Sequence, residues 1–372
     1  MPEITLIDVT KRFGNFTAVE KLNLQIADGG FVTLLGPSGC GKTTTLRMIA
    51  GLETPTEGDI LINGKPVFSS SKGIDVSPSK RDVGFLFQNY ALWPHMTVEQ
   101  NISFGLENLK WDKQRIKARV DELLTMLKID PLGKRYPNEL SGGQQQRVAI
   151  ARTLATGPKV LFMDEPLSNL DAKLRTEMRS ELKRLHTETD STFVYVTHDQ
   201  LEAMTLSTKT CLLKDGIVQQ YAPPLEIYNK PANIFAADFV GSPTMNLFEI
   251  IGRKGNSGEI LLQAGGPAMV FTSVSGEIAI KDDQALTLGI RPEFIRIGEN
   301  GSMKAVIYAA LPSGMETIVK LKMGELILTA VVFGAIDFKP DTETTIDFTG
   351  DNCNLFDRES GVNLGLGRIT FP

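Results

Sequence analysis

The first two thirds of the chain alternate short apolar runs with amphipathic stretches. Three of the runs have the length and composition of strands buried inside an α/β sheet. They are 31–35, 160–163 and 193–197. Two other segments, 113–128 and 172–188, carry apolar residues at helical spacing, which predicts helices that face a core. We therefore expect an α/β domain over residues 1–235.

Beyond about residue 245 the pattern changes to short strand-like pieces separated by glycine and proline turns. Val319, Leu321 and Met323 alternate with two lysines, as in a strand with one buried face. Turn formers at 241–243 interrupt the pattern between the two regions. The sequence therefore predicts an all-β domain over residues 236–372. Its expected strands include 259–262, 286–290, 303–307 and 326–332.

Composition supports two domains and limits the partners. A chain of 372 residues exceeds the usual size of a single hydrophobic core. Its formal charge of −5 gives no electrostatic reason to expect a nucleic-acid partner. The first residues lack a secretion-signal pattern, and no run approaches the roughly 18 apolar residues that cross a bilayer, so we expect any membrane role to require a partner. Cys40, Cys211 and Cys353 fit neither a zinc spacing nor a disulfide framework, and we expect reduced thiols.

A glycine-rich loop with P-loop spacing follows the strand expected at 31–35. A helix that starts after this loop offers unpaired N–H donors and a positive dipole end, both of which favour phosphate. Lys42 would add its ammonium to the β and γ oxygens, and Thr43 would supply a hydroxyl for Mg²⁺. Thr44 is ambiguous, because hydroxyls also cap helix starts. The loop consists of Gly36, Pro37, Ser38, Gly39, Cys40, Gly41, Lys42 and Thr43.

Two acids and a histidine follow the other expected strands. Asp164 and Glu165 come after 160–163, and His198 comes after 193–197. Open α/β sheets bind ligands at the carboxyl ends of their strands. We expect Asp164 to hold Mg²⁺ through water and Glu165 to act as general base on the attacking water. His198 would contact the γ-phosphate or align Glu165; for the acids alone, ordinary strand termination is the alternative interpretation.

The segment 140–144, Leu-Ser-Gly-Gly-Gln, narrows the class of protein. Its glycines permit close backbone approach, and a helix starting after them would direct its N-terminus at an anion. A helix merely capped by Ser141 is the local alternative. On the same chain as a complete P-loop, the segment indicates an ATP-binding cassette.

With these motifs the chain resembles the ATPase subunits of ABC importers, most of all the sugar-importer subfamily typified by the maltose transporter ATPase. Gln88 opens a Q-loop, 168–171 matches the D-loop, and Phe13 lies where the family has its adenine-stacking aromatic residue. The resemblance covers nearly the whole chain. It implies a P-loop ATPase with a helical subdomain at about 89–157, followed by an OB-like, TOBE-type regulatory domain.

The resemblance also implies roles for individual residues, with ATP and Mg²⁺ as cofactors. Catalysis is expected of Lys42, Gln88, Glu165 and His198, and metal binding of Thr43, Gln88 and Asp164. Contacts with ATP are expected of Phe13, the loop 36–44, Ser141, Gly143, Gln144 and Asp171.

The expected partners follow from the same resemblance. Two cassettes would pair head to tail, so that Ser141 and Gly143 address the γ-phosphate held by the other copy. The homodimer would lie at the cytoplasmic face of the membrane and dock two permease subunits, with an extracytoplasmic binding protein in the full complex. A regulatory protein or ligand could bind the C-terminal domain.

The identity of the cargo stays open at this stage. Phe294 stands where many relatives have histidine, 207–209 departs from the usual residues, and 66–78 is longer than in the simplest sugar cassettes. A carbohydrate is the expected cargo, with glycerol 3-phosphate, polyamine or ferric iron as alternatives. A soluble ABC ATPase outside transport is a more distant alternative, because the chain has neither paired cassettes nor a long coiled-coil insert.

Overall fold

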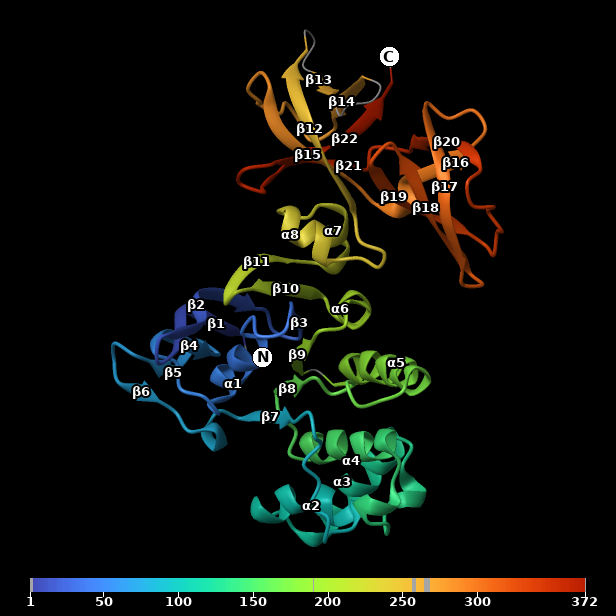
Figure 1. Ribbon diagram of the computed structural model, residues 1–372. Helices are drawn as coiled ribbons and strands as arrows, with labels where there is room; N and C mark the ends of the chain where they lie inside the picture. Colours follow the sequence, from blue (N-terminus) through green and yellow to red (C-terminus); the bar gives the residue numbers. More distant parts are fainter. Residues whose placement is uncertain (1–2, 190, 256–258, 264–267, 372) are drawn as a thin grey trace. The chain divides into compact units, whose positions relative to one another are not determined.

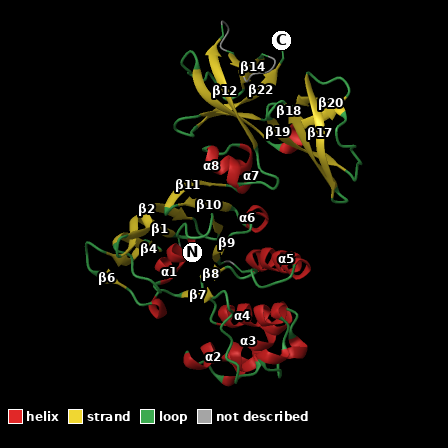
Figure 2. Cartoon of the chain, in the orientation of Figure 1, coloured by secondary structure: helices red, strands yellow, loops and turns green. Residues whose placement is uncertain are grey.

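The computed structural model describes residues 3–189, 191–255, 259–263 and 268–371. It divides into two compact units, Met1–Pro224 and Leu225–Pro372. Figure 1 follows the chain from end to end, and Figure 2 shows that the helices gather in the first unit while strands dominate the second.

A six-stranded sheet forms the centre of the first unit, in the order β11-β10-β3-β9-β8-β7. The pairs from β10 to β7 are parallel, and β11 pairs antiparallel to β10. Every residue of β3, β8 and β9 is buried, because separate apolar clusters cover the two faces. This confirms the predicted α/β core. The strands are β3 (Phe31–Leu35), β7 (Val83–Leu86), β8 (Val160–Asp164), β9 (Thr192–Thr197), β10 (Lys209–Lys214) and β11 (Ile217–Ala222).

A second, antiparallel sheet in the same unit was not anticipated. Its order is β2-β1-β4-β5-β6. Register shifts in β1, between Leu6 and Val9 and again beyond Val9, break the strict alternation by which such a strand is recognised in a sequence. The strands are β1 (Ile4–Phe13), β2 (Phe16–Ile26), β4 (Glu57–Ile62), β5 (Lys65–Ser69) and β6 (Ile74–Asp75).

The helices of the first unit other than α1 begin at side-chain caps. Thr97 forms a capping box with Gln100 at α2, and Asp112 caps α3. The apolar stripe of the predicted helix 113–128 is largely buried, as expected of a core-facing helix. The helices are α1 (Lys42–Ala50), α2 (Val98–Asn108), α3 (Lys113–Met126), α4 (Gly142–Ala155), α5 (Ala172–Glu188) and α6 (Gln200–Leu206), with short 3-10 turns at Pro78–Lys80, Asp130–Leu132 and Pro137–Glu139.

The second unit confirms the predicted β domain and adds detail to it. Strands β12, β13, β14, β22, β21 and β15 close into a barrel, and a separate sheet has the order β16-β20-β17-β18-β19. The sequence pattern did not separate these two sheets. The strands are β12 (Asn246–Lys254), β13 (Ile260–Gln263), β14 (Met269–Ser273), β15 (Gln284–Ile290), β16 (Ile295–Gly298), β17 (Met303–Pro312), β18 (Glu316–Met323), β19 (Leu326–Phe333), β20 (Glu343–Phe348), β21 (Cys353–Asp357) and β22 (Asn363–Thr370), with a 3-10 turn at Pro292–Phe294.

The second compact unit begins at Leu225, whereas the domain boundary expected from the sequence lies after residue 235. Two short helices, α7 (Pro224–Asn229) and α8 (Ile234–Phe239), precede the barrel. The buried guanidinium of Arg291 explains why they belong with the strands. It donates to the carbonyl oxygens of Tyr228, Ala237 and Val240 and lies over the Tyr228 ring. A charged group so deep in the protein requires these partners, so it ties the helices to the end of β15.

Candidate nucleotide-binding and catalytic site

The P-loop joins β3 to α1, the arrangement that the sequence predicts. Gly41 is the N-cap of α1 with φ 96°, and because it is a glycine no side chain closes the first turn. A Cβ on Gly36 would lie 2.2 Å from the Leu213 carbonyl oxygen, and one on Gly41 would lie 2.5 Å from that of Ala18. Both glycines are therefore required by the fold of the loop itself, and the uncapped helix start remains available to an anion.

Lys42 lies folded under the loop. Its ammonium is buried and donates to the carbonyl oxygens of Gly36 and Pro37, each at 2.8 Å. Cys40 is also buried, with Sγ 3.7 Å from Lys42 Nζ. Burial raises the pKa of the Cys40 thiol, partly offset by Lys42, so at neutral pH this sulfur stays protonated and serves as packing. Pro37 and Thr44 are half-buried, while Ser38 and Gly39 are exposed.

Asp164 ends β8 beside the first turn of α1. The Thr43 hydroxyl donates to Asp164 Oδ1 at 2.8 Å, and Arg47 Nη2 lies 3.4 Å from Oδ2. The carboxylate is 4 % exposed, so these contacts offset the free-energy cost of its burial. A hydroxyl and a carboxylate therefore lie side by side below the P-loop. Within the described residues no group of three His, Cys, Asp or Glu side chains could hold a metal ion by itself.

Three predicted catalytic side chains meet at the edge of the sheet. His198 Nδ1 lies 3.3 Å from Glu165 Oε2, and Gln88 Nε2 lies 3.4 Å from the same oxygen. They come from neighbouring strands, since Gln88 follows β7, Glu165 follows β8 and His198 follows β9. Both contacts are long for hydrogen bonds, and the His198 side chain is 59 % exposed. Gln88 and His198 are thus brought to the Glu165 carboxylate, whose side chain is 22 % exposed and so reachable by water.

The backbone of Glu165 is strained and held in place. Its φ of 45° is left-handed, a conformation that costs an L residue of order 1–3 kcal/mol. The Glu165 N–H donates to the Val196 carbonyl at 3.1 Å, and the Ser168 hydroxyl donates to the Glu165 carbonyl at 2.9 Å. Strain that the surroundings maintain in this way is typical of functional positions.

The segment 140–144 forms the start of α4 and satisfies its own donors. Gln144 N–H donates to Ser141 Oγ at 3.4 Å, and Ser141 N–H donates to Gln144 Oε1 at 2.9 Å, a capping box. A Cβ on Gly143 would lie 2.5 Å from the Leu174 side chain, so this glycine makes room for α5. In the part of the chain that the structure describes, neither Ser141 nor Gln144 makes a side-chain hydrogen bond to the P-loop.

Asp171 and Phe13, two further residues predicted to contact ATP, lie outside the P-loop in the single chain. Asp171 is the N-cap of α5, where its side chain accepts from Leu174 N–H at 3.0 Å. Phe13 ends β1 in an exposed hairpin and is 47 % exposed, with Lys11 Nζ 4.6 Å from its ring centroid. The Phe13 ring is thus accessible to a flat ligand. The Asp171 side chain, in contrast, already has a structural role within the chain as the cap of α5.

Arg81 supports the site and was missed by the sequence analysis. Its buried guanidinium donates to the carbonyl oxygens of Met48 and Ile49, each at 2.9 Å, in the last turn of α1. A cation there satisfies open carbonyls and complements the dipole of the helix whose other end forms the P-loop. Gly51 gives it room, since a Cβ there would lie 2.6 Å from Arg81 Nε. Arg81 also pairs with the nearby Asp75 carboxylate at 3.2 Å. No motif marked this arginine, because its link to α1 is made through backbone carbonyls that are distant in the sequence.

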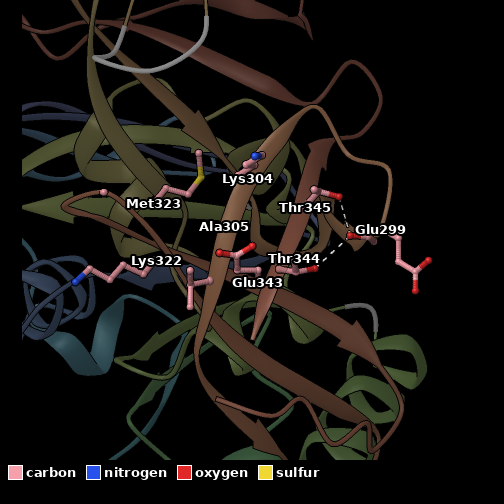
Figure 3. Close-up of a pocket in the computed structure, with 11 residues that line it drawn as sticks. Glu299, Lys304, Ala305, Lys322, Met323, Glu343, Thr344 and Thr345 are labelled. Carbon is pink, nitrogen blue, oxygen red and sulfur yellow. Dashed lines mark hydrogen bonds between the residues drawn. The ribbon is translucent and has the colours of Figure 1, made fainter. Parts of the chain in front are cut away.

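A cavity in the second unit has a different character. It has a volume of about 470 Å³ and lies among β17, β18 and β20. Figure 3 shows Lys304 and Lys322 directed away from one another. Thr344 and Thr345 both direct their hydroxyls at the Gly298 carbonyl, within the sheet. The polar side chains do not converge on one point, so the P-loop region remains the candidate site.

Comparisons with known proteins agree with this geometry. Residues 19–168 match the ABC transporter family. The chain is 43 % identical to the trehalose/maltose import ATP-binding protein of Thermococcus litoralis, over 97 % of this chain and 99 % of the relative. It is also 43 % identical to the sn-glycerol-3-phosphate import ATP-binding protein of Escherichia coli K12, over 98 % of this chain and 100 % of the relative. Among solved structures, a dimeric ATP-binding cassette in a post-hydrolysis state with ADP and Pi matches with a TM-score of 0.52 and 35 % identity, covering 59 % of this chain and 98 % of the other.

The chain belongs to the family of ABC transporter ATP-binding proteins. It is an ATP-binding ATPase, and the predicted fold class, an ABC ATPase followed by a β domain, is confirmed. None of the described helices is long and apolar enough to cross a membrane.

Proposed function

We propose that this chain is the ATP-hydrolysing subunit of an importer and that carbohydrate is its cargo. The convergence of Gln88 and His198 on the Glu165 carboxylate beside the P-loop carries the catalytic part of this proposal. The transport part is supported by relatives of nearly equal length whose names state import of trehalose/maltose and of glycerol 3-phosphate. Glycerol 3-phosphate is the second candidate cargo, because the two relatives are equally similar to this chain.

Each side chain at the sheet edge has a defined task in hydrolysis. Lys42 binds the β and γ oxygens of ATP, replacing the loop carbonyls that now accept from its ammonium. Glu165 accepts a proton from the water that attacks the γ-phosphoryl group. Gln88 and His198 hold the Glu165 carboxylate toward that water, and the long contacts tighten when the nucleotide is bound.

Mg²⁺ fits the residues present. Mg²⁺ prefers oxygen ligands, keeps several waters and is usually held by one or two protein groups together with substrate phosphates. Thr43 and Asp164 offer a hydroxyl and a carboxylate side by side, and Gln88, whose amide nitrogen contacts Glu165, carries an amide oxygen as a further candidate ligand. When bound, the ion neutralises charge on the phosphate oxygens.

A second copy of the chain completes the site. Ser141 and Gly143 of one copy contact the γ-phosphate held by the P-loop of the other, in a head-to-tail pair. The similar cassette that was solved as a dimer with ADP and Pi supports the pairing of two copies. The pair acts at the cytoplasmic face of the membrane, docks two permease subunits and works with an extracytoplasmic binding protein. Residues 236–372 stabilise the pair and accept a regulatory protein or ligand.

Purification from the native membrane tests the transport role. We expect the chain to co-purify with two hydrophobic subunits, and vesicles containing that complex to take up a labelled disaccharide when ATP is supplied on the chain's side. Uptake of glycerol 3-phosphate alone would select the second cargo. Recovery with ribosomes or DNA, without membrane subunits, would contradict transport altogether.

A further inference from the structure

Arg152, on α4, reaches across to the loop that follows Gln88. Its Nη1 donates to the Ala91 carbonyl at 2.6 Å and its Nη2 to the Tyr90 carbonyl at 2.7 Å. The guanidinium also lies 4.9 Å from the ring centroid of Trp93. One arginine therefore holds two consecutive carbonyls and an aromatic ring of the same loop, a geometry that the planar fork of arginine suits and a lysine cannot reproduce.

The backbone held by Arg152 is unusual. Tyr90 has φ 60° and Ala91 has φ 47°, so two consecutive L residues are left-handed. Such a conformation is unfavourable for residues with a Cβ and persists only where neighbouring groups impose it. The carbonyl oxygens of these same two residues accept the two short hydrogen bonds from Arg152. Arg152 is thus a main cause of the loop's conformation.

The other end of the loop is tied to the segment that contains Glu165. Asn169 Nδ2 donates to the Gln88 carbonyl at 3.2 Å. The Tyr90 hydroxyl donates to the Pro166 carbonyl at 3.3 Å, one residue after Glu165. The loop between β7 and α2 is therefore fixed on one side by the D-loop region and on the other by α4, the helix that begins at Ser141.

From this geometry we propose that Arg152 is a positioning residue for ATP hydrolysis. By fixing residues 90 and 91 it sets where Gln88 lies against Glu165. It also links that position to α4 and hence to residues 140–144, the signature segment. Arg152 acts on the hydrolytic step and not on nucleotide binding, because its partners are in the loop after Gln88 and not in the P-loop. This inference rests on the role proposed above for Gln88.

The first test separates binding from turnover in the full-length chain. Arg152→Lys keeps the charge but loses the fork, so we expect kcat to fall roughly tenfold or more, as for a misplaced catalytic group, while the Kd for ATP changes less than about twofold. Adding Ala91→Gly to Arg152→Lys should recover part of kcat, because glycine adopts the left-handed conformation at low cost. Loss of ATP binding in parallel with kcat would overturn the proposal.

Arg119→Ala is the matched control. Arg119 donates to the Leu154 and Ala155 carbonyls at the end of the same helix, at 2.9 and 3.4 Å, and its described contacts do not include the loop after Gln88. Both Arg119→Ala and Arg152→Ala should lower the melting temperature. Only Arg152→Ala should lower kcat per ATP-binding site, and an equal fall in both would mean that Arg152 is merely structural.

A double-mutant cycle with Gln88→Ala is decisive. If Arg152 acts through Gln88, then Arg152→Ala has little further effect on kcat once Gln88 is alanine. Multiplicative effects of the two substitutions on kcat, with Gln88→Ala itself slow, would overturn the positioning role alone. Normal turnover by Gln88→Ala would overturn both the proposed role of Gln88 and the role of Arg152, so the two failures are distinguishable.

Discussion

Two helix N-termini in the first unit have the same dipole but opposite surroundings. At the start of α1, Gly41 leaves the first turn uncapped, and the P-loop is folded around the buried ammonium of Lys42. At the start of α4, Ser141 and Gln144 satisfy each other in a capping box, and no basic residue lies in its first turn. One helix start is built to receive an anion, and the other is closed by its own side chains.

This difference suggests separate tasks for two parts of the proposed site. We call the P-loop with Asp164 and Glu165 the α1 half, and residues 140–144 the α4 half. In the proposed function the α1 half would bind the nucleotide within one chain, with Asp164 and Glu165 alongside it. In the α4 half, Ser141 Oγ accepts a hydrogen bond from the capped turn, and its own hydroxyl proton stays available to donate to a phosphate. The capping box stabilises the start of α4 within one chain, and in the proposed dimer a second copy would supply the anion. Four substitutions test this division, and the one with the largest expected effect comes first.

Glu165→Gln should have the largest effect on kcat, and this effect should arise in the α1 half alone. The amide cannot accept the water's proton, so we expect kcat to fall about 10³-fold while ATP still binds. A stable ATP-bound dimer should accumulate and can be measured by light scattering. Glu177→Gln, an exposed position on α5, is the control and should behave as wild type. Normal hydrolysis by Glu165→Gln would remove Glu165 from the role of general base.

Lys42→Ala should act on binding itself. It removes the ammonium from the phosphate oxygens, and we expect the Kd for ATP to rise about 100-fold, ~2.7 kcal/mol. Isothermal titration calorimetry measures this directly, with the exposed Lys72→Ala as the control. Unchanged affinity would contradict the account of the α1 half.

Gly142→Ala should separate stability from turnover in the α4 half. Among the residues that the structure describes, a Cβ there would come within 4 Å of the Leu170 side chain alone, at 3.7 Å, which is an ordinary contact. Alanine in a helix should therefore raise the free energy of unfolding by roughly 0.5–1 kcal/mol. A partner's nucleotide would approach this backbone closely, so kcat should fall roughly tenfold. Increased stability with full activity would indicate that no ligand approaches α4.

Phe13→Ala should have the smallest effect. Loss of stacking with the adenine should weaken ATP binding about fivefold, ~1 kcal/mol, and should leave binding of triphosphate without a base unchanged. Phe16→Ala is a close control, because Phe16 pairs with Phe13 in the same hairpin and is 60 % exposed. Equal effects of the two substitutions would exclude a specific role for Phe13.

The sequence predicted most of the α1 half because its chemistry follows strand ends. Strands 31–35, 160–163 and 193–197 deliver the P-loop, Glu165 and His198 to one edge, and the structure added the order and parallel pairing of these strands. The supporting contacts were not predictable, since Arg81 reaches α1 and Arg152 reaches the loop after Gln88 through backbone carbonyls, which no residue type marks in the sequence.

For the signature segment, residues 140–144, the sequence motif and the local structure point to different roles. Its motif indicated anion binding, but the structure shows Gly143 making room for Leu174 and Ser141 capping a helix, which are local roles of the kind offered as the alternative. The antiparallel sheet was missed because register shifts interrupt its alternating pattern. The sequence therefore predicted which candidate catalytic residues lie together better than it predicted the packing that positions them.

A mixed dimer tests the central claim, that each nucleotide site is shared between two copies. Lys42→Ala disables the α1 half of one chain, and Ser141→Arg blocks the α4 half of another, so neither variant alone should hydrolyse ATP. In a mixed dimer the intact P-loop of the second chain would face the intact signature segment of the first. We predict that mixing the two variants restores ATP turnover to a level well above that of either alone. A mixture that forms dimers yet stays as inactive as its components would contradict the account.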